Sequence, residues 1–310
     1  MRALIVGFGS IGRRHYDVLL ALKKFSKIDL VTSQKELLLN DQVTTIYESL
    51  DDVLLSEYEY FLIATPTALH QRQLKFIDDR VSGKCIFCEK PLFEKFYDLK
   101  AKNDIFVGYV LRYHPLILKT KELLFGEKIL SANIKCAQYL PTWRAGDYTQ
   151  CYSSKRELGG GVLLDLSHEI DYALWFFGEF DEIKSFNSKI SDLKITSDDI
   201  AVILARAGST FVSMQVDYIS KLTHRQIFID TQEFSIFIDL IKNELIKKDK
   251  EGFEEKTSVV LERNDMFKSM HLDILGDRKN VCTFEQAMSV MRVIKSVQEQ
   301  NDGSFMHDMC

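Results

Sequence analysis

The sequence predicts an α/β fold, with a doubly wound parallel sheet in the first third of the chain and, after it, an α+β domain with a large, mostly antiparallel open sheet. The first observation is that apolar, strand-like runs alternate with helix-period segments up to about residue 115, a pattern typical of parallel sheets covered by helices. The second is that apolar residues recur with period two from Ile129 onward. A chain of 310 residues suffices for about two domains, which we place at 1–115 and 116–310.

The elements of the first domain follow from short apolar runs bounded by turn residues. We expect strands at 2–6, 28–33, 43–47, 60–64, 85–88 and 105–109, with helices between most of them. A helix from about 116 to 125 then leads into the second domain.

The second domain combines alternating strands with three helical stretches. Period-two runs cover 129–140, 183–188, 200–206, 210–219, 226–230 and 233–238. The residues 207–209 and 230–232 are typical of turns between neighbouring antiparallel strands. Helical spacing covers 161–177, 265–275 and 283–298.

Composition excludes several classes of partner. The net charge of −5 gives no general attraction to nucleic acid or to an anionic membrane surface. No apolar stretch is long enough to span a bilayer, so we expect a cytoplasmic protein. Cys85 and Cys88 fall on opposite faces of an expected strand, which argues against a shared metal ion or a disulfide between them.

A glycine pattern follows the first expected strand directly. Gly7, Gly9 and Gly12 form Gly-x-Gly-x-x-Gly at the entry of an amphipathic helix. In such a turn the first glycine permits the tight bend, the second lets a pyrophosphate approach the backbone, and the third lets the helix pack closely on the sheet. The helix N-terminus then faces the phosphates. The pattern predicts a dinucleotide site in a Rossmann-type domain.

Three further segments fall at the carboxyl ends of expected strands, where open α/β sheets bind ligands. They are Ala64-Thr65-Pro66 with His70 nearby, Glu89-Lys90-Pro91, and Arg112-Tyr113-His114-Pro115. Beyond them, three glycines at 159–161 precede Asp165 and His168, which a continuous helix would place on one face. We expect the glycines to let another molecule come close. The alternative is a capping aspartate and a buried histidine.

Together these motifs resemble those of the Gfo/Idh/MocA family of oxidoreductases, grouped around glucose-fructose oxidoreductase and inositol dehydrogenase. The resemblance extends over essentially the whole chain and implies NAD or NADP on the first domain and a sugar or cyclitol against the second. It implies Lys90 beside the carbinol oxygen, with Asp165 and His168 as companions. Many members separate the last two by three residues, whereas only Leu166 and Ser167 stand between them here, so Lys90 is the first choice for the proton carrier.

Hydride leaves a carbinol carbon readily only as the hydroxyl proton leaves, so the chemistry needs a base within hydrogen-bond reach. A lysine at its ordinary pKa of about 10.4 is a poor base near neutrality. Burial and an oxidised nicotinamide both disfavour the ammonium form. Histidine titrates closer to neutrality, so His168 is the alternative carrier, with Asp165 orienting the group.

The expected cofactor contacts come from the glycine turn and the strand ends. They are Gly7, Phe8, Gly9, Ser10, Ile11, Gly12, Arg13, Ser33, Lys35, Ala64, Thr65, Pro66, His70, Glu89, Lys90 and Arg112. An NAD enzyme usually has a carboxylate at the end of the second strand. Asp29 comes too early, and Lys35 or Arg13 could attract a 2′-phosphate. The sequence therefore favours NADP over NAD. We expect no metal ion.

Substrate contacts are expected from Lys90, Asp165 and His168 and from four aromatic or basic residues, Tyr113, Trp143, Arg144 and Tyr148. The loop that carries Trp143 could equally be a packed aromatic loop. Arg225 could bind a carboxylate or phosphate bidentately, or be a solvated charge at the start of a strand.

The leading interpretation is an NAD(P)-dependent oxidoreductase acting on a secondary alcohol of a sugar, sugar derivative or cyclitol. Two alternatives stay open: elimination and hydrolysis of a glycoside through transient oxidation by a tightly bound nucleotide, and a non-catalytic nucleotide sensor. The outer face of the second sheet keeps apolar residues such as Phe211. We therefore expect a homodimer or homotetramer through that face.

Overall fold

The computed structural model describes residues 1–34, 37, 44–143 and 146–301. It divides the chain into two compact units. The first unit holds Met1–Phe93, Tyr97–Tyr113 and Glu262–Ala287, and the second holds Glu94–Phe96, His114–Leu261 and the chain from Met288 on. The segment 262–287, which the sequence analysis assigns to the second domain, thus packs with the first. The reason is that Phe267, Met270 and Ile274 are buried in the same core as the first strands.

The first unit is built on a seven-stranded sheet in the order β15-β6-β5-β4-β1-β2-β3. Its strands are β1 (Arg2–Val6), β2 (Lys27–Val31), β3 (Ile46–Tyr47), β4 (Tyr60–Ile63), β5 (Cys85–Cys88), β6 (Asp104–Val107) and β15 (Cys282–Thr283). All neighbours pair in parallel except β15, which runs antiparallel to β6. The six parallel strands have the 3-2-1-4-5-6 order of a doubly wound nucleotide-binding sheet, as predicted. Residue 43, the expected start of the third strand, lies outside the described residues.

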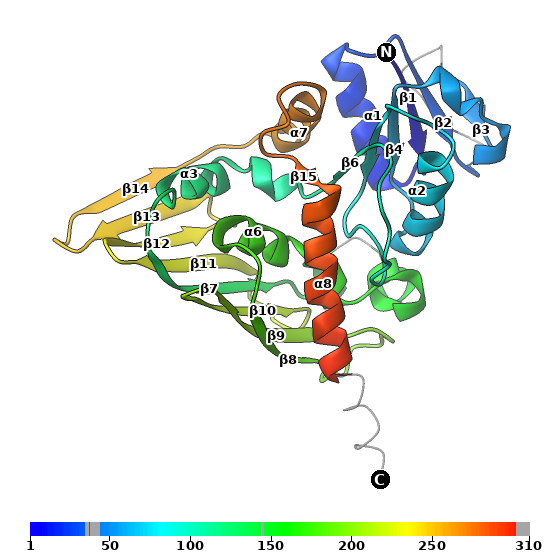
Figure 1. Ribbon diagram of the computed structural model, residues 1–310. Coiled ribbons are helices and arrows are strands. Elements are labelled where there is room, and N and C mark those ends of the chain that lie inside the picture. Colours follow the sequence, from blue (N-terminus) through cyan, green and yellow to red (C-terminus); the bar gives the residue numbers. More distant parts are fainter. Residues whose placement is uncertain (35–36, 38–43, 144–145, 302–310) are drawn as a thin grey trace. The chain divides into compact units, whose positions relative to one another are not determined.

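Helices cover both faces of this sheet. Figure 1 shows α1 (Ser10–Leu22) and α2 (His70–Asp78) on opposite sides of it. Right-handed crossovers require this, because the chain moves from β1 toward β2 in one direction and from β4 toward β5 in the other. The helix α7 (Asp265–Leu275), which the sequence predicts with the same bounds, packs against α1.

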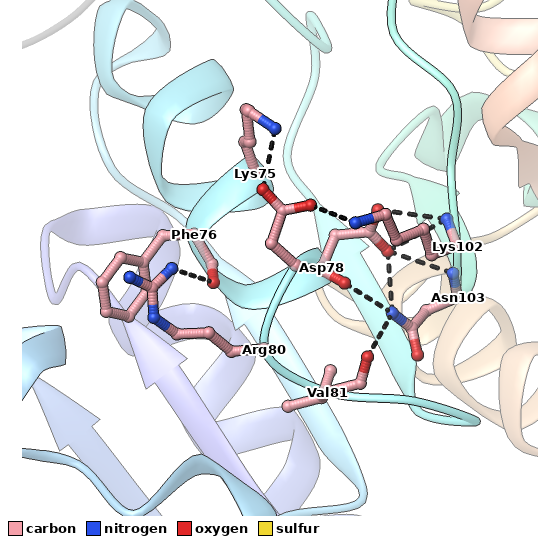
Figure 2. A network of polar contacts seen from close by, with 8 residues as sticks. Lys75, Phe76, Asp78, Arg80, Val81, Lys102 and Asn103 are labelled. Carbon is pink, nitrogen blue, oxygen red and sulfur yellow. Dashed lines mark hydrogen bonds and ion pairs between the residues drawn. The ribbon is translucent and has the colours of Figure 1, made fainter.

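Polar contacts fix the connection between α2 and β6 (Figure 2). The carboxylate of Asp78 accepts hydrogen bonds from the backbone N–H of Lys102 at 3.0 Å and from the backbone and side chain of Asn103 at 3.0 and 2.8 Å. Asp79 pairs with Lys102 and Lys75, and these contacts lower the pKa of Asp79 to about 2. The start of β6 is therefore held by side chains of the helix that precedes β5.

The second unit is built on an eight-stranded sheet in the order β14-β13-β12-β11-β7-β10-β9-β8. Its strands are β7 (Ile129–Ala137), β8 (Glu182–Ser188), β9 (Ile200–Ala207), β10 (Thr210–Asp217), β11 (His224–Thr231), β12 (Phe234–Asp239), β13 (Glu244–Asp249) and β14 (Glu254–Ser258). Neighbours are antiparallel except β7 and β10. Both predicted turns join antiparallel neighbours, β9 to β10 and β11 to β12.

The helices of this part of the chain are α3 (Pro115–Leu123), α4 (Leu140–Trp143), α5 (Val162–Asp165), α6 (His168–Phe177) and α8 (Phe284–Asn301). Figure 1 shows α3 and α6 over one face of the eight-stranded sheet. On β10 the residues Val212, Met214 and Val216 are buried toward that side, whereas Phe211 is 66% exposed on the other. Within the described residues, no helix is both long and apolar enough to cross a membrane.

Candidate active site

The glycine turn of the first unit has the shape that a dinucleotide requires. Gly7 has φ +94°, and a Cβ there would lie 2.8 Å from the carbonyl of Ala64. A Cβ on Gly12 would lie 2.2 Å from the carbonyl oxygen of Gly7, so α1 could not begin so close to β1 with any other residue. A Cβ on Gly9 would meet no atom within 4 Å. The first and third glycines are therefore needed by the chain itself, and open space stands over the second.

The carboxyl ends of four strands meet at one edge of the sheet beside this turn. In register, Val6 pairs with Ile63, Ile63 with Cys88, and Cys88 with Val107. The residues that follow are Gly7, Ala64, Glu89 and Gly108. The sheet order reverses between β1 and β4, and open α/β sheets bind their ligands at such a switch point.

The end of β2 presents hydroxyl and amide groups at this edge. Thr32, Ser33 and Gln34 follow the strand, and the Gln34 amide donates to the carbonyl oxygen of Phe8 at 3.0 Å. Asp29 is buried within the strand and accepts from the Thr45 backbone and the Tyr58 hydroxyl. Burial would raise the pKa of Asp29, but these hydrogen bonds outweigh it and lower the pKa. Asp29 is therefore a structural carboxylate. Lys35 lies outside the described residues.

Lys90 follows β5 at the same edge of the sheet as the glycine turn, and it is partly exposed. Its backbone N–H donates to the Glu89 carboxylate at 3.1 Å. His70, a predicted cofactor contact, is fully enclosed, with its ring nitrogens 2.9 Å from the carbonyl oxygen of Thr65 and 3.0 Å from that of Pro91. Burial lowers the pKa of His70. Both partners are acceptors and a neutral imidazole has one N–H, so neutral His70 donates to one of the two carbonyl oxygens. Its contact with a cofactor stays a prediction.

The side chains of Arg112 and Tyr113 form hydrogen bonds inside the first unit. The Arg112 guanidinium donates to Gln286 at 2.7 Å, and the Tyr113 hydroxyl donates to Asp273 at 2.7 Å. Both side chains are buried, and they fasten the segment 262–287 to the end of β6. Their predicted contacts with cofactor or substrate stay predictions.

In the second unit the predicted helix 161–177 is two helices. α5 ends at Asp165 and α6 begins at His168, because hydrogen bonds from Ser167 to Leu164 and from Glu169 to Leu166 tighten the chain between them. Asp165 and His168 are both buried, but they do not share the face of one continuous helix, so that expectation was wrong.

Two tyrosines hold the carboxylate of Asp165. Tyr152 donates to one oxygen and Tyr218 to the other, each at 2.5 Å. Burial and the neighbouring Asp165 raise the pKa of Tyr218 well above its ordinary value, so the phenol remains a donor. The Trp143 ring lies 5.8 Å from the ring of Tyr218. Asp165 is therefore a fixed acceptor at the base of an aromatic cluster.

The glycines before α5 are required by the chain itself. A Cβ on Gly160 would lie 2.1 Å from the carbonyl oxygen of Tyr152, and one on Gly161, at φ +128°, would lie 2.2 Å from the Asp198 carboxylate. From the sequence, we expect the glycines at 159–161 to let another molecule come close. The space beside these two is occupied by neighbouring protein backbone and the Asp198 side chain.

Arg225 binds a carboxylate, and that carboxylate is its own chain's Glu169. The guanidinium Nε lies 2.7 Å from Oε1 and Nη2 lies 3.4 Å from Oε2. The Glu169 side chain is 0% exposed and that of Arg225 14% exposed. Burial would lower the pKa of Arg225, but the charge of Glu169 outweighs it and raises the pKa. Arg225 is therefore not a solvated charge, because Glu169 pairs with its Nε and Nη2. Its predicted contact with a ligand stays a prediction.

Comparisons with known proteins agree with this geometry. Residues 1–107 match the oxidoreductase family model described as a Gfo/Idh/MocA NAD-binding Rossmann fold, and residues 127–237 match the C-terminal domain of the same family. The chain belongs to the Gfo/Idh/MocA family of oxidoreductases. An uncharacterised oxidoreductase of Streptococcus pneumoniae is 25% identical over 146 residues, which span 44% of this chain and 39% of that protein.

Solved structures share the fold along nearly the whole chain. UDP-N-acetylglucosamine 3-dehydrogenase from Acidithiobacillus ferrooxidans has a TM-score of 0.74 at 16% identity and 98% coverage of both chains. The WlbA dehydrogenase from Bordetella pertussis, solved with NADH and UDP-GlcNAcA, has a TM-score of 0.78 at 16% identity. Levoglucosan dehydrogenase, solved with NADH, has a TM-score of 0.81 at 17% identity. Each match covers 98% of this chain and 97% of the other chain. At these identities the likeness concerns the fold.

Within this Gfo/Idh/MocA chain, sequence reasoning missed several partners of the predicted site residues. Tyr152 and Tyr218 hold Asp165, and His15 bonds the Glu89 carboxylate at 2.8 Å. In the period-two run 210–219, Tyr218 has the same parity as Val212 and Met214, which are buried. No sequence pattern paired it with Asp165. Tyr148 accepts a hydrogen bond from the backbone of Lys194, and Arg144 lies outside the described residues.

Proposed function

We propose that this chain is an NAD(P)-dependent oxidoreductase that transfers a hydride between a nicotinamide cofactor and a secondary alcohol or ketone of a sugar, sugar derivative or cyclitol. The observation that carries the proposal is the position of Lys90, which follows β5 at the same sheet edge as the glycine turn. The similar structures include UDP-N-acetylglucosamine 3-dehydrogenase and levoglucosan dehydrogenase, which favours a carbohydrate substrate.

The residues at the switch point suit a dinucleotide. The open space over Gly9 and the N-terminus of α1 would take the pyrophosphate, since helix N-termini attract anions. The segment of Ala64, Thr65 and Pro66 would line the adjoining ribose. A bound nicotinamide would supply the hydride acceptor or donor.

The protein's own chemical contribution is proton transfer at Lys90. In oxidation, its neutral amine Nζ would accept the hydroxyl proton of the carbinol as the carbon is oxidised to a ketone, and in reduction the ammonium would return that proton. His168 would be the alternative proton carrier, with Asp165 orienting the group, and both would contact the substrate. Net change in free NAD(P)H distinguishes this reaction from redox-assisted elimination, which regenerates the starting nucleotide.

A substrate panel tests the proposal. The full-length protein is incubated with NAD⁺ or NADP⁺ and with UDP-N-acetylglucosamine, levoglucosan, glucose or myo-inositol, and nicotinamide absorbance is followed. Steady accumulation of reduced nucleotide with one class of substrate supports the proposal. Nucleotide binding without turnover of any compound, in either direction, supports the sensor alternative instead.

Cofactor preference gives a separate prediction. Thr32 and Ser33 carry no negative charge, and Arg13, which is exposed in the first turn of α1, could attract a 2′-phosphate. We therefore expect NADPH to bind about tenfold more tightly than NADH, the value of one additional charge-assisted contact. Titration by nicotinamide fluorescence measures both constants. Ser33→Asp, which adds a carboxylate for the ribose 2′-hydroxyl, should reverse the order. Tighter binding of NADH by the unaltered protein would show the preference to be wrong.

We further propose that the outer face of the eight-stranded sheet binds a second copy of this chain. Phe186, Leu204 and Phe211 are 78, 57 and 66% exposed there, and Phe228 is 47% exposed. A groove among them is bordered by charges of both signs, Glu182, Lys184, Arg206 and Asp230. A face with both signs around an apolar centre can complement itself about a two-fold axis.

Phe211→Glu should convert the dimer to monomer, because it places a charge at the centre of the apolar face. Phe253→Glu is the matched control, since Phe253 is 70% exposed in the turn between β13 and β14. Light scattering coupled to size-exclusion chromatography measures the mass. A monomeric unaltered protein, or dissociation by both variants alike, would argue against this interface.

A further inference from the structure

Four buried side chains of the first unit form one continuous hydrogen-bonded chain. His15 on α1 places Nε2 2.8 Å from Glu89 Oε1 and Nδ1 2.8 Å from Nε2 of His271 on α7. His271 Nδ1 lies 2.8 Å from the Tyr60 hydroxyl on β4. His15 and His271 are 0% exposed and Tyr60 is 1% exposed. No role in the reaction proposed above has been given to His15, His271 or Tyr60.

The chain of hydrogen bonds has one consistent direction. A carboxylate only accepts, so His15 must donate from Nε2 to Glu89. With a single ring proton, which then sits on Nε2, His15 accepts at Nδ1, so His271 donates from Nε2. His271 in turn accepts at Nδ1, so the Tyr60 hydroxyl donates to it. The direction thus runs from Tyr60 through His271 and His15 to Glu89.

The surroundings favour the neutral forms of His271 and Tyr60. Burial, and next the neighbouring His15, lower the pKa of His271 well below its ordinary value. Burial raises the pKa of Tyr60 well above its ordinary value. Phe87 and Phe267 pack edge-on against the His15 ring, with ring centroids 5.1 and 5.2 Å away. The ring nitrogens of both histidines and the Tyr60 hydroxyl are therefore buried, where a polar group without a hydrogen bond costs free energy.

The chain ends on a carboxylate that is already confined. Glu89 Oε2 accepts the backbone N–H of Lys90 at 3.1 Å. On another side, a Cβ at Gly108 would lie 2.8 Å from Glu89 Oε1, so the carboxylate fills the space that this glycine leaves. The rotamer of Glu89 therefore sets the position of the Lys90 amide, from which the Lys90 side chain starts.

We propose that His271 is a positioning residue for Lys90, acting through His15 and Glu89. The proposal depends on the function proposed above, because it assigns His271 to the same reaction. It explains why a polar side chain of α7, a helix late in the sequence, is placed in the core beside the first strands. In the competing account, His271 only fills space among Tyr60, Phe87 and His15.

Two substitutions at His271 separate these accounts. Glutamine can place its amide N–H where His271 Nε2 lies and so keep the donor toward His15. Asparagine can place its amide oxygen where Nδ1 lies and so keep only the acceptor for Tyr60. Both are uncharged, polar amides, so a residue that only fills space predicts similar behaviour from the two.

We expect His271→Gln to retain kcat within a factor of about three of the unaltered protein. His271→Asn should lower kcat about tenfold or more, the loss expected for a displaced catalytic group. The KM for nucleotide should change little in either variant. The assay uses the best substrate of the panel. Equal kcat values for the two variants would overturn the proposal.

Nuclear magnetic resonance of the full-length protein, without substrate or nucleotide, tests the same point independently of turnover. The backbone amide resonance of Lys90 should move in His271→Asn and stay in place in His271→Gln, and the ¹⁵N shifts of His15 should report a proton on Nε2 and none on Nδ1. An unmoved Lys90 resonance in the asparagine variant, or a proton on His15 Nδ1 in the unaltered protein, would overturn the proposal. Absence of turnover across the substrate panel with the expected resonances would count against the proposed function alone.

His15→Asn replaces His271→Asn if that variant does not fold, as judged by circular dichroism. It removes the donor to Glu89 one link closer, and the same displacement of the Lys90 amide is expected, with His15→Gln as its control. A Lys90 resonance unchanged in both His15 variants would equally contradict the positioning role.

Discussion

Lys90→Met is expected to lower turnover by about 100-fold to 10,000-fold, the usual contribution of a positioned general acid or base. Methionine keeps an unbranched side chain of similar length but has no titratable proton. The Lys90 backbone N–H, which donates to Glu89, is retained. We therefore expect nucleotide affinity within a factor of about three of the unaltered protein, because the amine acts on the substrate proton. Steady-state kinetics and NADPH titration measure the two effects.

Lys84→Met is the matched control for this prediction. Lys84 precedes β5 and Lys90 follows it, so the two lysines stand at opposite ends of one strand. Lys84→Met should leave turnover unchanged, because ligands of parallel sheets bind at the carboxyl ends. Full activity of Lys90→Met on the true substrate would refute the assignment of the proton carrier. Equal losses in both variants would point to a loss of fold.

Arg225→Met is expected to destabilise the second unit by about 3–5 kcal/mol, the cost of leaving a buried carboxylate without its partner. Glu169 is 0% exposed, and without Arg225 its remaining polar neighbours among the described residues are the Tyr172 hydroxyl at 3.4 Å and the Cys136 thiol. Denaturant unfolding followed by tryptophan fluorescence measures the effect. Both tryptophans, Trp143 and Trp175, belong to the second unit, so the signal reports that unit alone.

The double variant Arg225→Met with Glu169→Met is the control. Replacing a buried ion pair by apolar side chains is often close to neutral, so the double variant should recover most of the stability lost in Arg225→Met. The single variant Glu169→Met completes the comparison. If the double variant loses as much stability as Arg225→Met and Glu169→Met lose in sum, the pair does not interact as the geometry indicates. A loss below about 1 kcal/mol in Arg225→Met would mean that the pair behaves as a solvated one.

The sequence predicted the elements whose patterns are local. The bounds of the strand 85–88 and the helix 265–275 agree with the structure. The strand is a short continuous apolar run, and in the helix the apolar residues recur with helical spacing. The strands β13 and β14 were not predicted. They include Lys247, Lys248, Glu254 and Glu255, and charged residues are common on strands near a sheet edge although they obscure the alternating pattern.

The partners of the site residues depend on contacts between distant parts of the sequence. Arg225 and Glu169 are 56 residues apart, and Tyr218 and Asp165 are 53 apart. Helical spacing over 161–177 could not show that Arg225 would reach Glu169. Periodicity likewise shows that α7 buries one face, but it does not show which of two cores that face enters.

The return of the segment 262–287 to the first unit has a consequence for how the protein is made. The nucleotide-binding half begins with the first residue, yet one of its core helices is translated only after nearly all of the other half. While the ribosome is still producing the eight-stranded sheet, the early part of the chain has neither α7 to cover α1 nor β15 to extend the sheet edge. Completion of the Rossmann half therefore waits until residues 262–287 have been synthesised, and a fragment ending near residue 115 would expose apolar surface to solvent.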